Sequence, residues 1–424
     1  MKISSIRGVK DILPGEIEKW RWVENWAHTL FSRYEFKEIR IPIFEKTDLF
    51  SRGIGETTDI VEKEMYTFTD RGNERLTLRP EGTASVVRSY IEHKMYNPPS
   101  VAKLYYLGPM FRYERPQAGR FRQFYQIGVE AMGSSSPVID AETITMAMEF
   151  FRELGLTKLD LLINSLGCPQ CRPKYREILK DSIRPHLREL CANCNQRYER
   201  NPLRILDCKV ERDKEIARGL PKTTDHLCEQ CETDFSEVQS LLNLAKIPFK
   251  TDPLLVRGLD YYTRTAFEVV SSGLGAQNAI CGGGRYDSLV EAFSGPPTPC
   301  FGFALGLERL ISVIPFEKIG EIHANSDLFV IALGTEAQKQ SFHIVHQLRA
   351  QGFRIDRVYE EASLKSQMRK ANKTLARFAL IVGENELKTG KYVLKNMQDG
   401  GQIEISGNSL IPEIQRHLAE GRNA

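Results

Sequence analysis

At residues 257–268 the sequence reads Arg-Gly-Leu-Asp-Tyr-Tyr-Thr-Arg-Thr-Ala-Phe-Glu. Two arginines, two acids and two tyrosines lie here between apolar segments typical of strands, which is more paired polarity than a purely structural strand needs. Arg257 offers a fixed fork of donors that suits a phosphate or a carboxylate. The tyrosines can close over a flat ring and still present hydroxyl groups. The stretch therefore predicts part of a binding site, with a solvent-facing hairpin edge as the alternative.

Length and composition favour two or three domains. The chain has 424 residues, enough for several sizeable cores. Its 58 Lys+Arg and 55 Asp+Glu leave a net charge of +3, so any contact with nucleic acid has to come from local basic patches. Residues 1–5 lack the apolar run of a secretory signal, and no stretch approaches the roughly twenty apolar residues of a membrane span. We therefore expect a cytoplasmic protein that does not enter a membrane.

Residues 104–114 and 120–132 predict a β-hairpin. Because side chains alternate along a strand, one face of this hairpin is apolar and the other carries arginines, an amide and an acid around an aromatic ring. Such a mixture suits a phosphate fork, a stacking ring and an anionic anchor, although a solvated sheet face would also explain the polarity. The polar face includes Arg112, Arg120, Arg122, Phe124, Gln126 and Glu130, and the apolar core face of the second strand begins with Phe121.

An earlier hairpin is predicted over residues 65–79 by alternation about a central turn. Pro80 ends its second strand, and Thr83 can begin a helix that continues to about residue 92. Glu81 then lies on a turn at the end of a strand, where a polar side chain can point into a site. An acid that merely opens the helix is an equally good interpretation of Glu81.

Three other segments complete the pattern. The helical spacing of apolar residues over 16–34 is followed by an extended segment over 36–44, whose Pro42 favours the edge of a sheet. Residues 282–287 read Gly-Gly-Gly-Arg-Tyr-Asp, which permits close approach of a ligand but matches neither the dinucleotide fingerprint nor the P-loop. Residues 300–310 form an apolar strand that enters a helix at Arg309, a cation that could also pair with neighbouring acids.

Together these motifs resemble those of the histidyl-tRNA synthetases, a family of class II aminoacyl-tRNA synthetases. Arg-Gly-Leu-Asp-Tyr-Tyr-Thr at 257–263, followed by Phe-Glu, looks like the histidine-specific motif. The segments 16–44, Phe111-Arg112-Tyr113-Glu114 and 300–310 resemble class II motifs 1, 2 and 3 in the family's order. The resemblance runs from about residue 5 to the C-terminus. It implies an α+β fold with an antiparallel sheet flanked by helices, and a homodimer formed through motif 1.

The resemblance also implies a reaction. L-Histidine is activated with ATP and Mg²⁺ to histidyl-adenylate, pyrophosphate is released, and the histidyl group is transferred to the 3′ end of tRNA(His). The loop 115–119 would approach the acceptor end of the tRNA. The implied catalytic residues are Arg112 and Arg257, which would act at the α-phosphate. The implied ATP-binding residues are Arg112, Arg120, Phe124 and Arg309, and the implied histidine-binding residues are Glu81, Thr83, Arg112, Gln126, Glu130, Arg257, Tyr261, Tyr262 and Tyr286.

The composition changes at residue 168. We expect an inserted helical, cysteine-rich module over 168–250 that divides a catalytic domain into parts 1–167 and 251–324. The module holds three Cys-x-x-Cys pairs and a lone Cys208, a pattern that favours metal or redox chemistry over a disulfide framework in a cytosolic chain. Two such pairs can supply four thiolates to a tetrahedral zinc ion.

The choice of zinc ligands is open. The first pair, Cys168 and Cys171, lies close to the last strand of the main domain, so we expect a structural zinc site of Cys191, Cys194, Cys228 and Cys231. Metal-free thiols are one alternative. A thioredoxin-like redox pair is disfavoured, because no pair opens the helix of a recognisable strand–loop–helix unit.

A last unit, 327–424, follows a polar linker at 323–326. Strands at 328–333, 353–358 and 379–382 alternate with helices at 335–350 and 363–375, which predicts a small α/β domain with parallel pairing. It resembles the anticodon-binding domain of class IIa synthetases. Its second helix carries a basic face suited to RNA phosphates or simply to solvent, formed by Lys365, Arg369, Lys370, Lys373 and Arg377.

Two other classes of protein share part of this pattern. The synthetase-like regulatory subunit of ATP phosphoribosyltransferase senses histidine without using tRNA, but such proteins generally lack the anticodon domain that 327–424 would form. A non-catalytic, zinc-dependent RNA-binding protein would explain the cysteines and the basic helix. It would leave Glu81, Glu130 and the convergent arginines unexplained.

Overall fold

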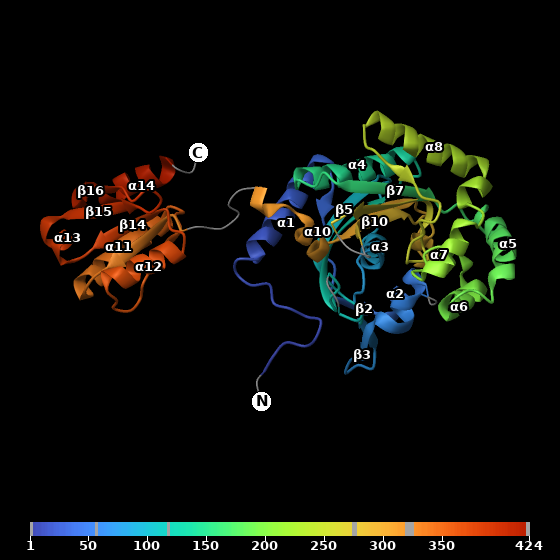
Figure 1. Ribbon diagram of the computed structural model, residues 1–424, viewed down its shortest axis with the longest axis horizontal. Coiled ribbons are helices and arrows are strands. Elements are labelled where there is room, and N and C mark those ends of the chain that lie inside the picture. The colour runs from blue at the N-terminus through green and yellow to red at the C-terminus, as the bar shows by residue number, and fades with distance from the viewer. Residues whose placement is uncertain (1–2, 56–57, 117–118, 274–277, 319–325, 421–424) are drawn as a thin grey trace. The chain divides into compact units, whose positions relative to one another are not determined.

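The computed structural model (Figure 1) describes residues 3–55, 58–116, 119–273, 278–318 and 326–420. The chain forms two compact units, Met1–Ile322 and His323–Ala424. The predicted linker falls mainly on 323–325, outside the described residues.

The first unit is built on an eight-stranded mixed sheet. Its inner strands pair antiparallel, whereas each edge strand runs parallel to its neighbour. The predicted hairpin 104–114 and 120–132 is present as β5 and β6, which pair from Ala102 opposite Met132 to Phe111 opposite Gln123. In spatial order the strands are β1 (Lys37–Glu38), β5 (Ala102–Phe111), β6 (Gln123–Met132), β11 (Cys300–Gly306), β10 (Ala279–Arg285), β9 (Thr263–Ser271), β7 (Leu159–Ser165) and β8 (Lys250–Thr251).

Helices cover one face of this sheet and form its main apolar core. Ile127 and Val129 of β6 point into this core and are fully buried, which leaves the alternate residues of β6 on the opposite face. Helix α8, expected within the separate module, contributes Phe235 and Val238 to the same core and lies beside α4 (Figure 1). The helices are α1 (Ile17–Arg33), α4 (Pro137–Glu153), α8 (Glu229–Leu244) and α10 (Leu307–Val313).

A small three-stranded sheet is formed by the segment that follows α1 and β1 in the sequence. It consists of β2 (Phe44–Lys46), β3 (Tyr66–Thr69) and β4 (Arg75–Leu78), so the hairpin predicted over 65–79 is confirmed. The helix predicted from Thr83 is also confirmed as α3 (Thr83–Glu92). The single extended segment expected over 36–44 was wrong, because its two ends pair in different sheets, with Pro42 between them. Helices α2 (Thr47–Ile54) and α9 (Leu289–Ala292) complete this region.

The rest of the cysteine-rich region is helical, as expected. Helices α5 (Arg172–Ile183), α6 (Ala192–Arg200) and α7 (Glu211–Arg218) bury Tyr175 and Leu179 in an apolar cluster that continues to Tyr262 of the histidine motif. The region therefore shares its core with the sheet.

The second unit has the predicted α/β order. The helices predicted over 335–350 and 363–375 are present as α11 (Thr335–Ala350) and α12 (Leu364–Lys373), and the predicted strands are β12 (Leu328–Ala332), β13 (Ile355–Arg357) and β14 (Phe378–Val382), paired in parallel. Four elements were not expected from the sequence: β15 (Lys391–Asn396) and β16 (Gln402–Ser406), which add an antiparallel edge, and helices α13 (Glu384–Thr389) and α14 (Leu410–Glu420). Among the helices described in either unit, none is long and apolar enough to cross a membrane.

Candidate active site

A cavity of about 280 Å³ opens on the face of the large sheet opposite the main core. The hairpin β5–β6, the stretch after Arg257, strand β10 and the start of α10 all contribute to its wall. Most of the site residues expected from the sequence lie together here: Glu81, Thr83, Arg112, Arg120, Phe124, Gln126, Arg257, Tyr261, Tyr262 and Arg309.

Arginines gather at one part of this cavity. The Arg112 guanidinium lies 5.2 Å from the centre of the Phe124 ring, and its Nε donates to the carbonyl oxygen of Pro80 at 2.8 Å. Arg120 pairs with Glu114 at 2.8 Å. Burial lowers the pKa of Arg309, and the positive charges of Arg120 and Arg112 lower it further. The fold thus holds like charges close together around an aromatic ring, an arrangement suited to a polyanion that carries a flat base.

Arg257 is held in place from two sides. Its Nη1 lies 2.7 Å from Glu268 Oε2, and the guanidinium lies 5.7 Å from the centre of the Tyr262 ring. A Cβ atom at position 282 would lie 2.3 Å from this guanidinium, so Gly282 is what allows the arginine to lie flat against β10.

Glu130 and Tyr286 do not line the cavity but lie directly behind it. Thr83 Oγ1, on the cavity wall, donates to Glu130 Oε1 at 2.7 Å, and the Tyr286 hydroxyl donates to Oε2. Glu130 is 1% exposed, and burial raises its pKa to about 8. A Cβ atom on Gly302 would lie 2.0 Å from the same carboxylate. The structure therefore forms a buried acid that is connected to the cavity through one threonine hydroxyl.

Glu81 both opens helix α3 and faces the site, the two roles that the sequence left open for it. Its carboxylate accepts the backbone N–H groups of Thr83 at 2.8 Å and Ala84 at 2.9 Å, so it caps α3. It also lines the cavity. Burial raises its pKa, with the backbone hydrogen bonds acting in the opposite direction.

Two polar atoms of the site lack a partner within the described part of the chain. They are the amide oxygen of Gln126 and Nε of Arg257, both inaccessible to solvent. A buried acceptor and a buried donor without partners are costly. Ligand groups of complementary character would relieve this cost.

Comparison with known proteins identifies the family. A family model described as histidyl-tRNA synthetase matches residues 8–310, and an anticodon-binding-domain model matches 327–417. The chain belongs to the histidyl-tRNA synthetase family. A histidine–tRNA ligase from Desulforamulus reducens is 52% identical over 96% of this chain and 97% of its own, and one from Halothermothrix orenii is 49% identical over 98% and 100%. The apo structure of histidyl-tRNA synthetase from S. aureus covers 98% of this chain and 100% of its own at 40% identity, with a TM-score of 0.83.

Membership in the histidyl-tRNA synthetase family confirms the predicted fold class and enzyme class. A structure described as an ATP phosphoribosyltransferase regulatory subunit/histidyl-tRNA synthetase from Bacillus halodurans is 19% identical, with a TM-score of 0.65, over 90% of this chain and 98% of its own. At that identity it shows the shared fold alone.

Three acids on the cavity wall, Glu114, Glu268 and Glu308, were not among the expected site residues. Glu114 and Glu268 are the partners of Arg120 and Arg257, and alternation along their strands could have pointed to them. Glu308 accepts the backbone N–H of Tyr125 at 3.0 Å, and burial raises its pKa to about 7. Glu308 directly precedes Arg309 in the segment that resembles motif 3, and no sequence pattern separates its role from that of a partner for the arginine.

Phe121 and Arg122 lie on the faces opposite to those expected from alternation along the second strand of the hairpin. Phe121, expected in the core, lines the cavity, whereas Arg122 leaves it and lies 4.2 Å from the centre of the Tyr113 ring. Both precede the start of the regular strand at Gln123, so strict alternation does not reach them. Of the hairpin loop 115–119, Gln117 and Ala118 lie outside the described residues.

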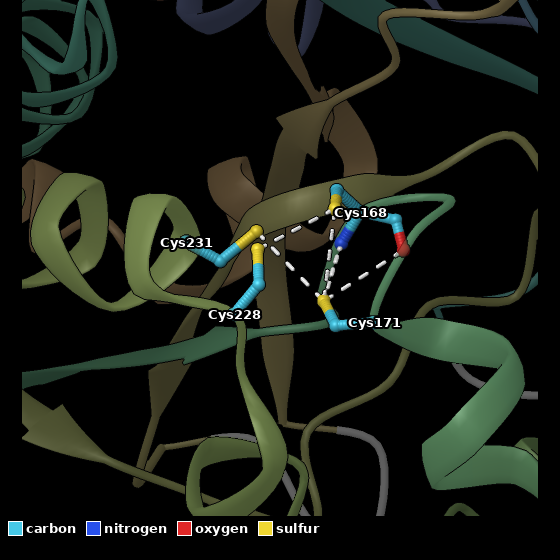
Figure 2. Close-up of side chains that lie close together, drawn as sticks. All are labelled: Cys168, Cys171, Cys228 and Cys231. Carbon is cyan, nitrogen blue, oxygen red and sulfur yellow. Dashed lines mark hydrogen bonds between the residues drawn. The ribbon is translucent and has the colours of Figure 1, made fainter.

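The expected set of zinc ligands was wrong, because the structure does not bring its two pairs together. Cys228 and Cys231 meet the first pair, Cys168 and Cys171 (Figure 2), whereas Cys191 and Cys194 meet Cys208 and Asp213. Cys168 and Cys171 lie close to the main domain, and α8 packs onto the same domain. The third pair, Cys228 and Cys231 at the start of α8, is therefore brought to the first pair. The expectation that no pair opens the helix of a strand–loop–helix unit was wrong for the first pair, since Cys168 and Cys171 lie between β7 and α5, with Cys171 at the N-cap position of α5.

Proposed function

We propose that this protein is a histidine–tRNA ligase that activates L-histidine with MgATP and transfers it to the 3′ end of tRNA(His). The observation that carries the proposal is one cavity in which Arg112, Arg120, Phe124 and Arg309 share a wall with the residues of the histidine motif. Phosphate ligands, a stacking ring and an amino-acid pocket are what a carboxylate–ATP condensation needs side by side.

In the first step a carboxylate oxygen of histidine attacks the α-phosphorus of ATP, and pyrophosphate leaves. Arg112 and Arg257 stabilise the charge that develops on the α-phosphate, while Arg120 and Arg309 hold the leaving phosphates and Phe124 stacks on adenine. Mg²⁺ enters with ATP as part of the substrate. In the second step a hydroxyl of the terminal adenosine attacks the carbonyl carbon of the adenylate, and AMP leaves.

The amino acid is recognised at the other end of the cavity. The unpartnered Gln126 oxygen and the Glu81 carboxylate suit an ammonium group, and Tyr261 and Tyr262 supply ring surface. Glu130, which accepts hydrogen bonds from Thr83 and Tyr286, would pair with an imidazole N–H placed against the threonine. An amino acid without ring nitrogens leaves these polar groups unpaired and is therefore rejected.

The proposal extends to the oligomeric state, the cellular compartment and the role of the cysteine clusters. A homodimer would cover the edge strand β1 and the apolar residues after it, of which Ile43 is 46% and Phe44 52% exposed. None of the nine cysteines, all of which lie in the described part of the chain, forms a disulfide, as expected in a reducing cytoplasm. The cysteine clusters lie outside the cavity lining, so zinc held there would act on the fold of the helical region.

Histidine-dependent exchange of pyrophosphate into ATP tests the proposal. We expect exchange with histidine alone among the amino acids, and we expect Arg257→Ala to slow it about 100-fold or more while histidine binding stays measurable. Arg122→Ala is the matched control, because it removes an arginine of the first unit that lies outside the cavity; its exchange rate should stay close to that of the parent. Histidine binding without any exchange would overturn the proposal in favour of a regulatory histidine sensor.

A further inference from the structure

Four cysteine sulfurs from two distant segments of the chain converge on one point (Figure 2). Cys168 and Cys171 follow β7, and Cys228 and Cys231 open α8. Their ligand atoms all lie within 4.8 Å of one another. All but Cys228 are buried.

The spacing of the sulfurs matches a metal tetrahedron. With zinc–sulfur bonds of about 2.3 Å, tetrahedral geometry places the sulfurs roughly 3.8 Å apart. In the structure the sulfurs are 3.7 Å apart for Cys168–Cys171, 3.8 Å for Cys168–Cys228 and 3.9 Å for Cys171–Cys231. Three of the six edges therefore match the tetrahedron, and all four sulfurs lie within 4.8 Å of one another.

The backbone around the first pair is shaped to receive thiolates. The N–H of Cys168 points at the sulfur of Cys171 at 3.1 Å, and the N–H of Gln170 points at the sulfur of Cys168 at 3.4 Å. Gly167 has φ of +69°, and a Cβ there would lie 2.8 Å from the Cys171 sulfur. Cys228 stands at the N-terminus of α8, where the helix dipole favours negative charge.

We propose that Cys168, Cys171, Cys228 and Cys231 bind a zinc ion that joins both ends of the helical region to the start of β9, directly after the pocket residues Tyr261 and Tyr262. Four thiolates suit zinc or iron, and zinc is the choice for a site outside the cavity, where no electron transfer is required. The backbone of Arg264, at the start of β9, exchanges hydrogen bonds with Leu166 and Gly167, which directly precede Cys168. Its side chain also reaches Asp234 of α8.

The ion would therefore position the pocket without touching the substrate. Arg172, one residue after the first pair, donates to the backbone carbonyl of Tyr262. Tyr262 lines the cavity and faces Arg257. The zinc ligands thus act as positioning residues for the histidine side of the site.

An independent cluster points to a second ion. Cys191, Cys194, Cys208 and Asp213 also place one ligand atom each within 4.8 Å of the others. The Cys191 and Cys208 sulfurs are 3.9 Å apart, and the Cys208 sulfur is 3.2 Å from Asp213 Oδ2. Cys191 caps α6 and Asp213 lies in α7, so this ion would join those two helices to each other.

Metal analysis of full-length protein and two double variants separates the sites. The parent should carry two zinc ions per chain by mass spectrometry, Cys168→Ser/Cys228→Ser one, and Cys191→Ser/Cys208→Ser one. Cys300→Ser is the matched control, because Cys300 is a buried thiol outside both clusters, and it should keep both ions. Unchanged zinc in either double variant overturns the site concerned, and iron in place of zinc overturns the assignment of the ion.

A conservative variant keeps the test valid if a double variant fails to fold. Half-buried Cys228 leaves room for an imidazole, so Cys228→His should still bind Co²⁺ at that site but with a weaker sulfur-to-cobalt charge-transfer band. Removal of the metal from the parent should lower its melting temperature and weaken histidine binding, and added zinc should restore both. An identical melting temperature and histidine affinity with and without metal would overturn the positioning role.

Discussion

At the scale of single residues, Glu130 makes stability depend on pH. Its pKa of about 8 in the folded protein lies above the ordinary value of 4.5 that it regains on unfolding. Between these values the folded state holds a proton that the unfolded chain has released, so protein stability falls as pH rises from about 5 to 8. Glu130→Gln cannot ionise. Its melting temperature relative to the parent should therefore rise by a few degrees between pH 6 and pH 8.5.

Differential scanning fluorimetry without ligand measures this effect. Glu291→Gln, which removes an exposed acid of α9, serves as the control and should show no such trend. A difference between Glu130→Gln and the parent that stays constant with pH would mean that Glu130 is already ionised in the fold.

Gly167 offers a second test at this scale. Gly155 and Gly167 both have positive φ, so alanine at either position carries a backbone cost of about 1 kcal/mol. Only at Gly167 does the new methyl group lie 2.8 Å from a sulfur; at Gly155 the nearest atom is 3.6 Å away. Gly167→Ala should therefore lower the free energy of unfolding by at least about 1 kcal/mol more than Gly155→Ala. Urea denaturation compares the two, and equal losses would show that the cysteine turn tolerates displacement.

At the scale of single elements, the exposed basic face of α12 is the expected binding surface for the phosphates of tRNA. Lys365, Arg369, Lys370 and Lys373 are exposed, whereas Arg377, expected on the same face, donates to the backbone of Leu418. Alanine at Arg369, Lys370 and Lys373 should weaken tRNA binding. The variant should also bind with a weaker salt dependence. The slope of the logarithm of the binding constant against the logarithm of salt concentration should fall in magnitude by about one for each phosphate contact that is lost. Pyrophosphate exchange should not change.

The matched control removes three exposed cations elsewhere in the same unit. Lys388, Lys391 and Arg416 each have an acidic partner, and their replacement by alanine changes the net charge equally. Filter binding at several salt concentrations compares the two triple variants. Equal weakening by both would mean that tRNA responds to overall charge and not to α12.

Elements with local signals were predictable from the sequence. The hairpins of β3–β4 and β5–β6 and helix α3 follow from alternation, a turn and a proline that stops a strand. The ligand sets of the cysteines depend on which helices fold back onto the sheet, and no local pattern encodes that. The same holds for Glu130, whose strand face was predicted but whose position behind Thr83 is set by Gly302 of β11 and by Tyr286, which directly follows β10.

At the scale of the whole molecule, the two compact units should divide the two half-reactions. All residues that line the cavity belong to the first unit. A fragment of residues 1–318 should therefore keep histidine-dependent pyrophosphate exchange close to that of the full chain, whereas transfer to tRNA falls about 100-fold or more because one of two linked RNA-binding surfaces is gone. Exchange and aminoacylation assays on the fragment test this. A fragment that folds but exchanges no pyrophosphate would show that the second unit is needed for adenylation.

The order of strands in the large sheet also matters while the chain is being synthesised. Met132 at the end of β6 pairs with Cys300 of β11, so the whole helical region and the histidine motif leave the ribosome before β6 gains its second neighbour. At about 5 to 20 residues per second this interval lasts on the order of ten seconds. Throughout it, the nascent hairpin that carries Arg112 and Phe124 presents an unpaired edge, the feature that invites association with other chains. The need for a chaperone should therefore be greatest before residue 300 emerges.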